Sequence, residues 1–143
     1  MSLNVDHLRR TADTLEHALL ALQGCPDADS VMYDLYRNAA IKSFELSLET
    51  AGKLMRKALK AFGGSPRDVD RLVFNEVLRN CGKHDLLDLA GVERWLAYRA
   101  NRNSTAHDYG VRFANETLTL LPGFVQDVRA LAVRLQKVFD AAA

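Results

Sequence analysis

Apolar residues recur along most of the chain at steps of three and four, the spacing that places them on one face of an α-helix. In residues 3–23 this spacing predicts a first amphipathic helix, with Leu3, Leu8, Leu15, Leu19 and Leu22 on its apolar face. The stretch 27–30 then supplies N-cap candidates for a second helix, which is expected to run to about Phe62 and to stop at two glycines. The buried face of this second helix is predicted to carry Leu35, Ala39, Phe44, Leu48, Ala51, Met55, Ala58 and Phe62.

The second half of the chain predicts two or three further helices. Ser65 and Pro66 are typical of a helix start, and a helix is expected from there through Leu78. Asp85 or Asp88 can cap the next helix, which is expected to be anchored by Leu86, Leu87, Leu89, Val92, Trp95 and Leu96. The last segment has a regular apolar seam, formed by Leu121, Phe124, Val128, Leu131, Leu135 and Val138. Pro122 predicts either a kink in that last helix or a helix start close to the proline.

No segment alternates with the period of a β-strand, and no linker, repeat or low-complexity stretch divides the chain. With 143 residues the chain is long enough to bury a core without disulfides or metals. The pattern therefore predicts one all-α domain over residues 1–143, folded as an up-and-down bundle of four to five helices.

Charge and cysteine content change this picture only slightly. The net charge of +1 does not suggest general nucleic-acid binding, so contact with RNA would need a local patch, for which Arg99, Arg102 and Arg112 are the candidates. Cys25 and Cys81 have neither metal-ligand nor redox spacing, which is typical of reduced cysteines in the cytoplasm. The N-terminus lacks the pattern of a signal peptide, and no apolar run is long enough to span a bilayer. We therefore expect a cytoplasmic protein with no membrane contact and no metal site.

Potentially reactive side chains are concentrated in residues 99–110. On a helix, Arg99, Asn103 and His107 lie on one stripe, and Gly110 is expected to end the helix. Arg102 and His107 are five residues apart, about 140° around the helix axis, so they do not face one another within one turn. Joint action would need either local distortion or a second copy of the chain across a two-fold axis. A homodimer is the simpler solution.

These residue types suit cleavage of a phosphodiester. A guanidinium grips phosphate through its planar fork, and an imidazole with a near-neutral pKa can take or give the proton when a ribose 2′-hydroxyl attacks. No metal is required for that reaction. On the residues alone, the competing interpretation is a helical bundle that binds another protein and has an ordinary polar helix end.

The segment Arg102-Asn103-Ser-Thr-Ala-His107-Asp-Tyr109 resembles the Arg-x4-His-x-Tyr signature of the HEPN superfamily, specifically its small bacterial branch encoded beside minimal nucleotidyltransferases. Residues 44–54, Phe-Glu-Leu-Ser-Leu-Glu-Thr-Ala-Gly-Lys-Leu, look like the long second helix of that branch, and the likeness spans nearly the whole chain. The resemblance implies a HEPN-like helical homodimer. Its partners would be a cognate minimal nucleotidyltransferase and RNA or a nucleotide.

The resemblance implies two alternative functions. The first is a metal-independent endoribonuclease toxin of a type II toxin–antitoxin pair, in which Arg102 holds the scissile phosphate, His107 is the general base or acid, and Asn103 orients one of them. The second is a non-catalytic subunit that binds nucleotide or substrate for a two-component nucleotidyltransferase. Either way we expect no cofactor in the chain itself, because ATP and Mg²⁺ would enter only through the partner nucleotidyltransferase.

Two further expectations concern single residues. The four-residue spacing of Glu45, Glu49 and Lys53 is typical of a solvated row of charges. The resemblance instead implies that acidic residues of this helix face the Arg–His cleft and orient its side chains, so that Glu45 and Glu49 belong, with Arg99 and Arg102, to a site for nucleic acid or nucleotide. Tyr109 is either a tyrosine with a packed ring and a solvated hydroxyl, or, as the resemblance implies, the residue to which the nucleotidyltransferase transfers AMP. An added AMP would bring negative charge to the place where RNA phosphate is expected to bind.

Overall fold

The structure is a computed structural model that describes residues 5–105 and 111–142. The described residues form six helices and no strand, which confirms the all-α prediction. The helices are α1 (Asp6–Gln23), α2 (Val31–Ala61), α3 (Pro66–Arg71), α4 (Phe74–Lys83), α5 (Leu89–Thr105) and α6 (Val111–Ala142). None of the described helices combines the length and the apolar character that crossing a bilayer requires.

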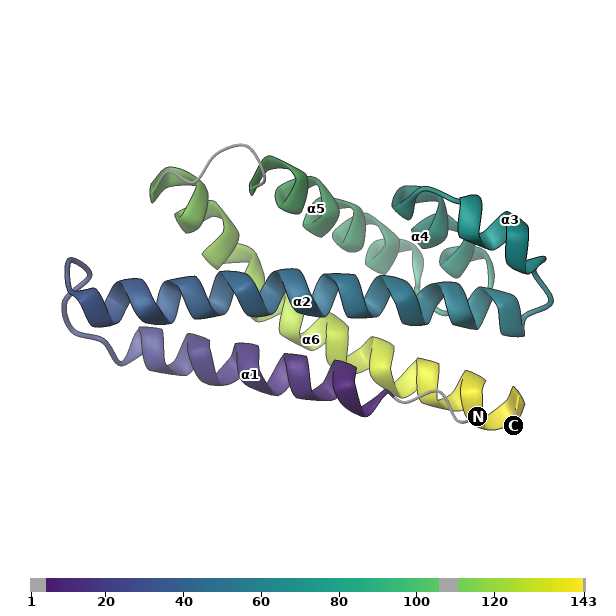
Figure 1. Cartoon of the computed structure of the whole chain (residues 1–143), viewed down its shortest axis with the longest axis horizontal. Helices are drawn as coiled ribbons and strands as arrows, with labels where there is room; N and C mark the ends of the chain where they lie inside the picture. The colour runs from purple at the N-terminus through teal and green to yellow at the C-terminus, as the bar shows by residue number, and fades with distance from the viewer. Residues whose placement is uncertain (1–4, 106–110, 143) are drawn as a thin grey trace.

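Helix α2 is the axis of the bundle and contacts each of the five other helices. Figure 1 shows α1 and most of α6 along one side of α2, and α3, α4 and α5 along the opposite side. Ser30 caps α2, because its hydroxyl accepts a hydrogen bond from the backbone N–H of Tyr33 at 3.1 Å. The predicted start of the second helix is thereby confirmed, and its expected end at Phe62 is within one residue of the observed end.

The middle of α2 supplies most of its buried face. Phe44, Leu48, Ala51, Met55 and Ala58 are buried as predicted, but the expected burial of three residues nearer the ends is wrong, since Leu35, Ala39 and Phe62 are exposed. A helix of 31 residues is roughly 46 Å long, whereas α1 with 18 residues is much shorter. Figure 1 shows α1 along the N-terminal part of α2, and the last turns of α2 extend beyond it on the side where α3 follows.

The single helix predicted to begin at Ser65 is in fact two helices, α3 and α4, and this prediction was wrong. Leu72 and Val73 are extended, with ψ of 135° and 158°. Arg56 of α2 explains the break, because its Nη1 and Nη2 donate to the carbonyl oxygens of Val69 and Leu72, at 2.8 Å each. These bonds compensate for the helix hydrogen bonds lost at the break. The corner between α3 and α4 is thus held against α2.

The aromatic core lies where α2, α5 and α6 meet. The rings of Phe44 and Trp95 each pack edge-on against Phe124, with centroids 4.8 and 5.5 Å away. The predicted seam of α6 is confirmed, with Val138 partly buried and the other five residues buried. A start of α6 close to Pro122 was the wrong alternative, since the helix begins at Val111 and continues through the proline.

Helix α5 begins where the sequence predicted. The carboxylate of Asp88 accepts a hydrogen bond from the backbone N–H of Gly91 at 2.6 Å, so Asp88 rather than Asp85 is the cap. Trp95 and Val92 are buried as expected, but Leu89 is exposed and does not anchor the helix. Its position in the first turn, next to the cap, leaves Leu89 outside the packed face.

Candidate functional site

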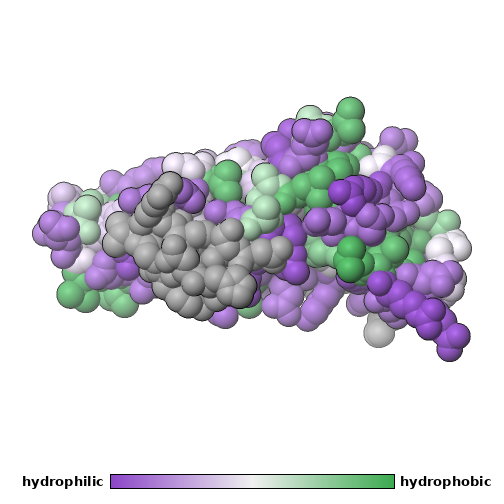
Figure 2. Space-filling model, turned by 90° about the horizontal axis from the view of Figure 1, so that it is seen from above, coloured by the Kyte–Doolittle hydropathy of each residue, from purple (hydrophilic) through white to green (hydrophobic). Residues whose placement is uncertain are grey.

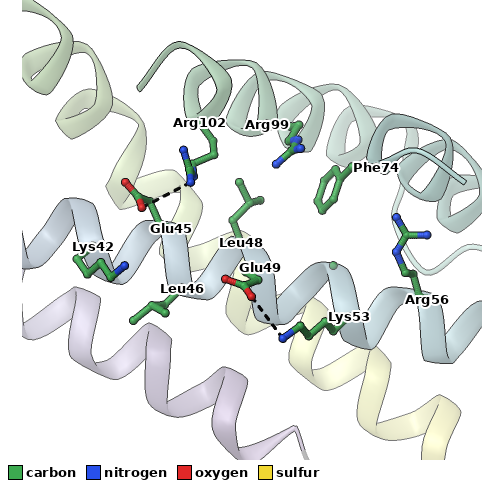
Figure 3. A pocket seen from close by; sticks show the side chains of 11 residues that line it. Lys42, Glu45, Leu46, Leu48, Glu49, Lys53, Arg56, Phe74, Arg99 and Arg102 are labelled. Carbon is green, nitrogen blue, oxygen red and sulfur yellow. Dashed lines mark ion pairs between the residues drawn. The ribbon is translucent and has the colours of Figure 1, made fainter. Parts of the chain in front are cut away.

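A cleft of about 360 Å³ lies between α2 and α5 and is closed at one end by the first residue of α4. Figure 3 shows side chains from α2 and α5 pointing toward one another across it. Its charged lining consists of five cations, Lys42, Lys53, Arg56, Arg99 and Arg102, and two carboxylates, Glu45 and Glu49. The formal local charge is therefore +3 in a protein whose net charge is +1. Because the net charge is so small, contact with RNA was expected to need a local cationic patch, and the cleft has such a local excess of positive charge.

Arg102, the first residue of the Arg-x4-His-x-Tyr motif, reaches this cleft from the last turns of α5. Its Nη2 lies 3.8 Å from Oε2 of Glu45 on α2, and the two side chains are 34% and 23% exposed. An ion pair of this length and exposure contributes little to stability. The guanidinium of Arg102 can therefore exchange the carboxylate for another anion at small cost.

The two carboxylates of the charged row on α2, Glu45 and Glu49, differ in their surroundings. Glu45 faces the cleft and Arg102, as the resemblance implied. Glu49 instead pairs with Lys53 at 3.3 Å, and both of these side chains are well exposed, as in an ordinary solvated i, i+4 pair. Both carboxylates line the cleft, but only Glu45 is close to an arginine of α5.

Arg99 lies one turn before Arg102 and is held by an aromatic ring, not by a carboxylate. Its Cζ is 5.2 Å from the centroid of Phe74, the first residue of α4. The ring of Phe74 sits against the backbone of Gly52, where a Cβ would lie only 2.7 Å from Cε2 of the ring. The sequence did not identify Phe74 as a site residue. An isolated glycine inside a long helical pattern was the available signal, since such a glycine often marks a close approach by a neighbour.

Arg56 is another cleft residue that the sequence did not identify as part of a site. It was interpreted only as part of a basic helix end, whereas the structure places it at the same end of the cleft as Phe74. Its function in the fold is to hold the α3–α4 corner through two backbone carbonyls. This long-range contact has no signature in the local sequence.

The second half of the predicted motif lies outside the residues that the structure describes. His107, Tyr109 and the predicted helix stop at Gly110 lie outside the described residues. Asn103 belongs to the backbone of α5, one residue after Arg102, but its side chain and that of Arg112 are also outside what the structure describes. Of the predicted motif, the structure therefore describes the side chain of Arg102, which lines the cleft from the last turns of α5.

Figure 2 views the molecule from the side of α3, α4 and α5, a face that is mostly hydrophilic with apolar patches chiefly over the half that α3 and α4 occupy. Among the described residues, no group of three or more His, Cys, Asp or Glu side chains is arranged to hold a metal ion.

The chain is similar to known proteins in both sequence and fold. Residues 4–137 match the family model described as nucleotidyltransferase substrate binding protein like. The "Probable ribonuclease HepT" of Haemophilus influenzae is 26% identical over 108 residues, which cover 76% of this chain and 73% of the relative. A solved structure, also from Haemophilus influenzae, was described as revealing the fold of a substrate-binding domain of a nucleotidyltransferase. The superposition covers 93% of this chain and 99% of the solved chain, with a TM-score of 0.80 and 24% sequence identity.

The solved structure shows a common fold, and the family model covers nearly the whole chain. Both agree with the resemblance found in the motif that begins at Arg102 and in the long helix that contains residues 44–54. The chain therefore belongs to the nucleotidyltransferase substrate-binding protein-like family, the branch of HEPN proteins associated with minimal nucleotidyltransferases.

Proposed function

We propose that this protein is a metal-independent endoribonuclease of the HEPN type, acting as the toxin of a type II toxin–antitoxin pair. The observation that carries the proposal is that Arg102 lies in a cleft with a cationic excess and is paired with Glu45 only loosely, at 3.8 Å. A guanidinium in that setting is available to bind a phosphate. The naming of a relative as a probable ribonuclease supports the same choice.

In the proposed reaction Arg102 holds the scissile phosphate and His107 transfers protons. The ribose 2′-oxygen attacks phosphorus, giving up its proton to a general base, and the bond from phosphorus to the 5′-oxygen breaks as that oxygen receives a proton. The products are a 2′,3′-cyclic phosphate and a 5′-hydroxyl. Asn103 would orient Arg102 or His107. On an unbroken helix the five-residue spacing of Arg102 and His107 would set them about 140° apart, so the proposed active unit is a homodimer with the two motifs facing each other.

The proposed regulator is a cognate minimal nucleotidyltransferase. With Mg²⁺, it would transfer AMP from ATP to Tyr109: the Tyr109 oxygen would bond to the α-phosphorus and lose its proton, and pyrophosphate would leave. The added phosphate would compete for the arginines of the cleft and repel RNA. Incubation with the nucleotidyltransferase, ATP and Mg²⁺ should add an AMP-sized mass to the wild type and none to Tyr109→Phe.

The test of the reaction is cleavage of single-stranded RNA by the purified protein with a chelator present. Wild type is expected to cut RNA but not a 2′-O-methyl strand, and Arg102→Ala and His107→Ala are expected to lose activity. Arg10→Ala is a matched control, since Arg10 is an exposed arginine of α1 outside the cleft. Equal cleavage by wild type and both motif variants would refute the assignment.

The second candidate is a non-catalytic subunit that binds nucleotide or substrate for the nucleotidyltransferase. The observation that favours it is the size of the cleft, since about 360 Å³ falls within the range of small-molecule sites. Nucleotide binding that depends on Arg102, combined with no RNA cleavage and no growth arrest on expression without the nucleotidyltransferase, would select this alternative.

A further inference from the structure

The cleft has two ends that differ in how their cations are held. At one end Arg102 pairs with Glu45, and at the other Arg56 and Arg99 line the cleft together with Phe74 (Figure 3). Within the described part of the chain, neither Arg56 nor Arg99 forms an ion pair with a carboxylate. The positive charge at this second end is therefore not neutralised by a neighbour.

The guanidinium of Arg56 uses two of its N–H donors in hydrogen bonds within the fold. Its two hydrogen bonds go to the carbonyl oxygens of Val69 and Leu72, which are neutral acceptors. A guanidinium has five N–H donors, so three are not used by these two bonds. The same two bonds hold the side chain in place, which lowers the entropy lost when an anion binds.

Arg99 contacts the ring of Phe74, and that ring is itself packed against α2. Phe74 rests on α2 at Gly52, where the missing Cβ leaves room for the ring. The ring in turn lies 5.2 Å from the Arg99 guanidinium carbon. An aromatic ring attracts a cation without supplying a formal negative charge, so Arg99 is positioned and its charge stays available.

We propose that Arg56 and Arg99 form a second phosphate subsite, and that Phe74 is its positioning residue. The inference rests on the proposed function: the subsite would bind the phosphodiester next to the scissile one in a single strand of RNA. Arg99 and Arg102 are three residues apart on α5, so they project from the same side of the helix and can serve neighbouring phosphates. The subsite would bind substrate and leave the chemistry to the motif.

Binding of an uncuttable ligand tests the subsite independently of catalysis. The probe is a short fluorescent 2′-O-methyl single strand, titrated with chelator present at several salt concentrations. Arg99→Gln is expected to weaken binding about tenfold and to reduce the slope of log K against log salt by about 0.7, the value for one phosphate contact in a single strand. Arg10→Gln, an exposed arginine outside the cleft, is expected to change neither quantity beyond the error of the measurement.

The outcomes separate the subsite from the proposed function. If Arg102→Gln weakens binding and Arg99→Gln behaves like Arg10→Gln, the subsite is refuted and the ribonuclease proposal stands. If wild type neither binds the strand nor cuts RNA, the proposed function fails and the subsite with it. With cuttable RNA, Arg99→Gln should raise KM and leave kcat nearly unchanged, whereas Arg102→Gln should lower kcat. A fall in kcat alone for Arg99→Gln would also refute the subsite.

The role of Phe74 is tested through Arg99. Phe74→Leu is expected to weaken strand binding about threefold, Phe74→Tyr to retain it, and Phe74→Leu to have no further effect in an Arg99→Gln background. The side-chain Nε–Hε NMR signal of Arg99 should shift in Phe74→Leu without any ligand, as the ring is lost. An unchanged signal, or additive losses in the double variant, would show that Phe74 does not act through Arg99.

Discussion

The hydroxyl of Tyr98 donates a hydrogen bond to the carboxylate of Asp127, joining α5 to α6 one residue before Arg99. Asp127 also accepts two hydrogen bonds from Nε and Nη2 of Arg94, at 2.9 Å each, in a bidentate pair. This cluster fixes the turn of α5 that leads into the cleft. Burial, then the hydrogen bond and the charge of Asp127, raise the pKa of the Tyr98 hydroxyl above its ordinary value.

Alkaline pH is therefore expected to destabilise the protein through Tyr98. A tyrosine whose pKa is raised by folding contributes stability that is complete below its unfolded pKa of about 10 and is lost as the pH rises toward the folded value. Chemical denaturation between pH 8 and pH 11 should show a smaller loss for Tyr98→Phe than for wild type. At neutral pH the free energy of unfolding of Tyr98→Phe should be about 1 kcal/mol lower than that of wild type, because the variant lacks one hydrogen bond. If the free energies of unfolding of wild type and Tyr98→Phe fell in parallel above pH 10, this role of Tyr98 would be contradicted.

Gly52→Ala is expected to destabilise the protein even though alanine is the better helix former. The new Cβ would lie 2.7 Å from the Phe74 ring, and overpacking costs about 1–3 kcal/mol, more than the gain in helix propensity of up to about 1 kcal/mol. In a Phe74→Ala background the clash is absent, so the same change should become stabilising. Urea denaturation of the four variants measures this reversal. The same sign in both backgrounds would show that Phe74 does not seat on Gly52.

Glu45→Gln is expected to strengthen binding of a phosphate ligand. The change removes the carboxylate that competes for Arg102 at 3.8 Å, and affinity for a single-stranded oligonucleotide should rise about threefold. Because the pair is partly exposed, the free energy of unfolding should change by less than about 1 kcal/mol. Glu49→Gln removes the same charge from the cleft but not from Arg102, and is the matched control. Equal gains in the two variants would assign the effect to overall charge.

The two cysteines are expected to differ sharply in reactivity. Burial raises the pKa of the Cys81 thiol to about 12, so almost no thiolate forms near neutral pH, whereas Cys25 is partly exposed. A thiol reagent should label the folded protein once, and Cys25→Ser should abolish that labelling. Denaturant should release the second thiol. Rapid labelling of Cys81 in the folded protein would mean that the packing around α4 opens more readily than the structure indicates.

Local patterns in the sequence were sufficient to predict most helices. The starts of α2 and α5 depend on Ser30 and Asp88, whose side chains cap the helix that immediately follows them, so short-range rules identify them. The seam of α6 was readable because residues on one helical face repeat at a fixed spacing. Arg99 and Arg102 were named as candidates from the sequence, Glu45 and Glu49 only through the family resemblance, and all four line the cleft.

Tertiary contacts decided the rest. The break between α3 and α4, which the sequence missed, depends on Arg56 binding carbonyls 13 and 16 residues further along the chain. The seat of Phe74 on Gly52 and its contact with Arg99 join three different helices. Periodicity reports which residues of a helix share a face, but it does not report which neighbour covers that face or where its ends remain uncovered. That is why the helices were predictable from the sequence, whereas the second end of the cleft appeared only when the helices were packed together.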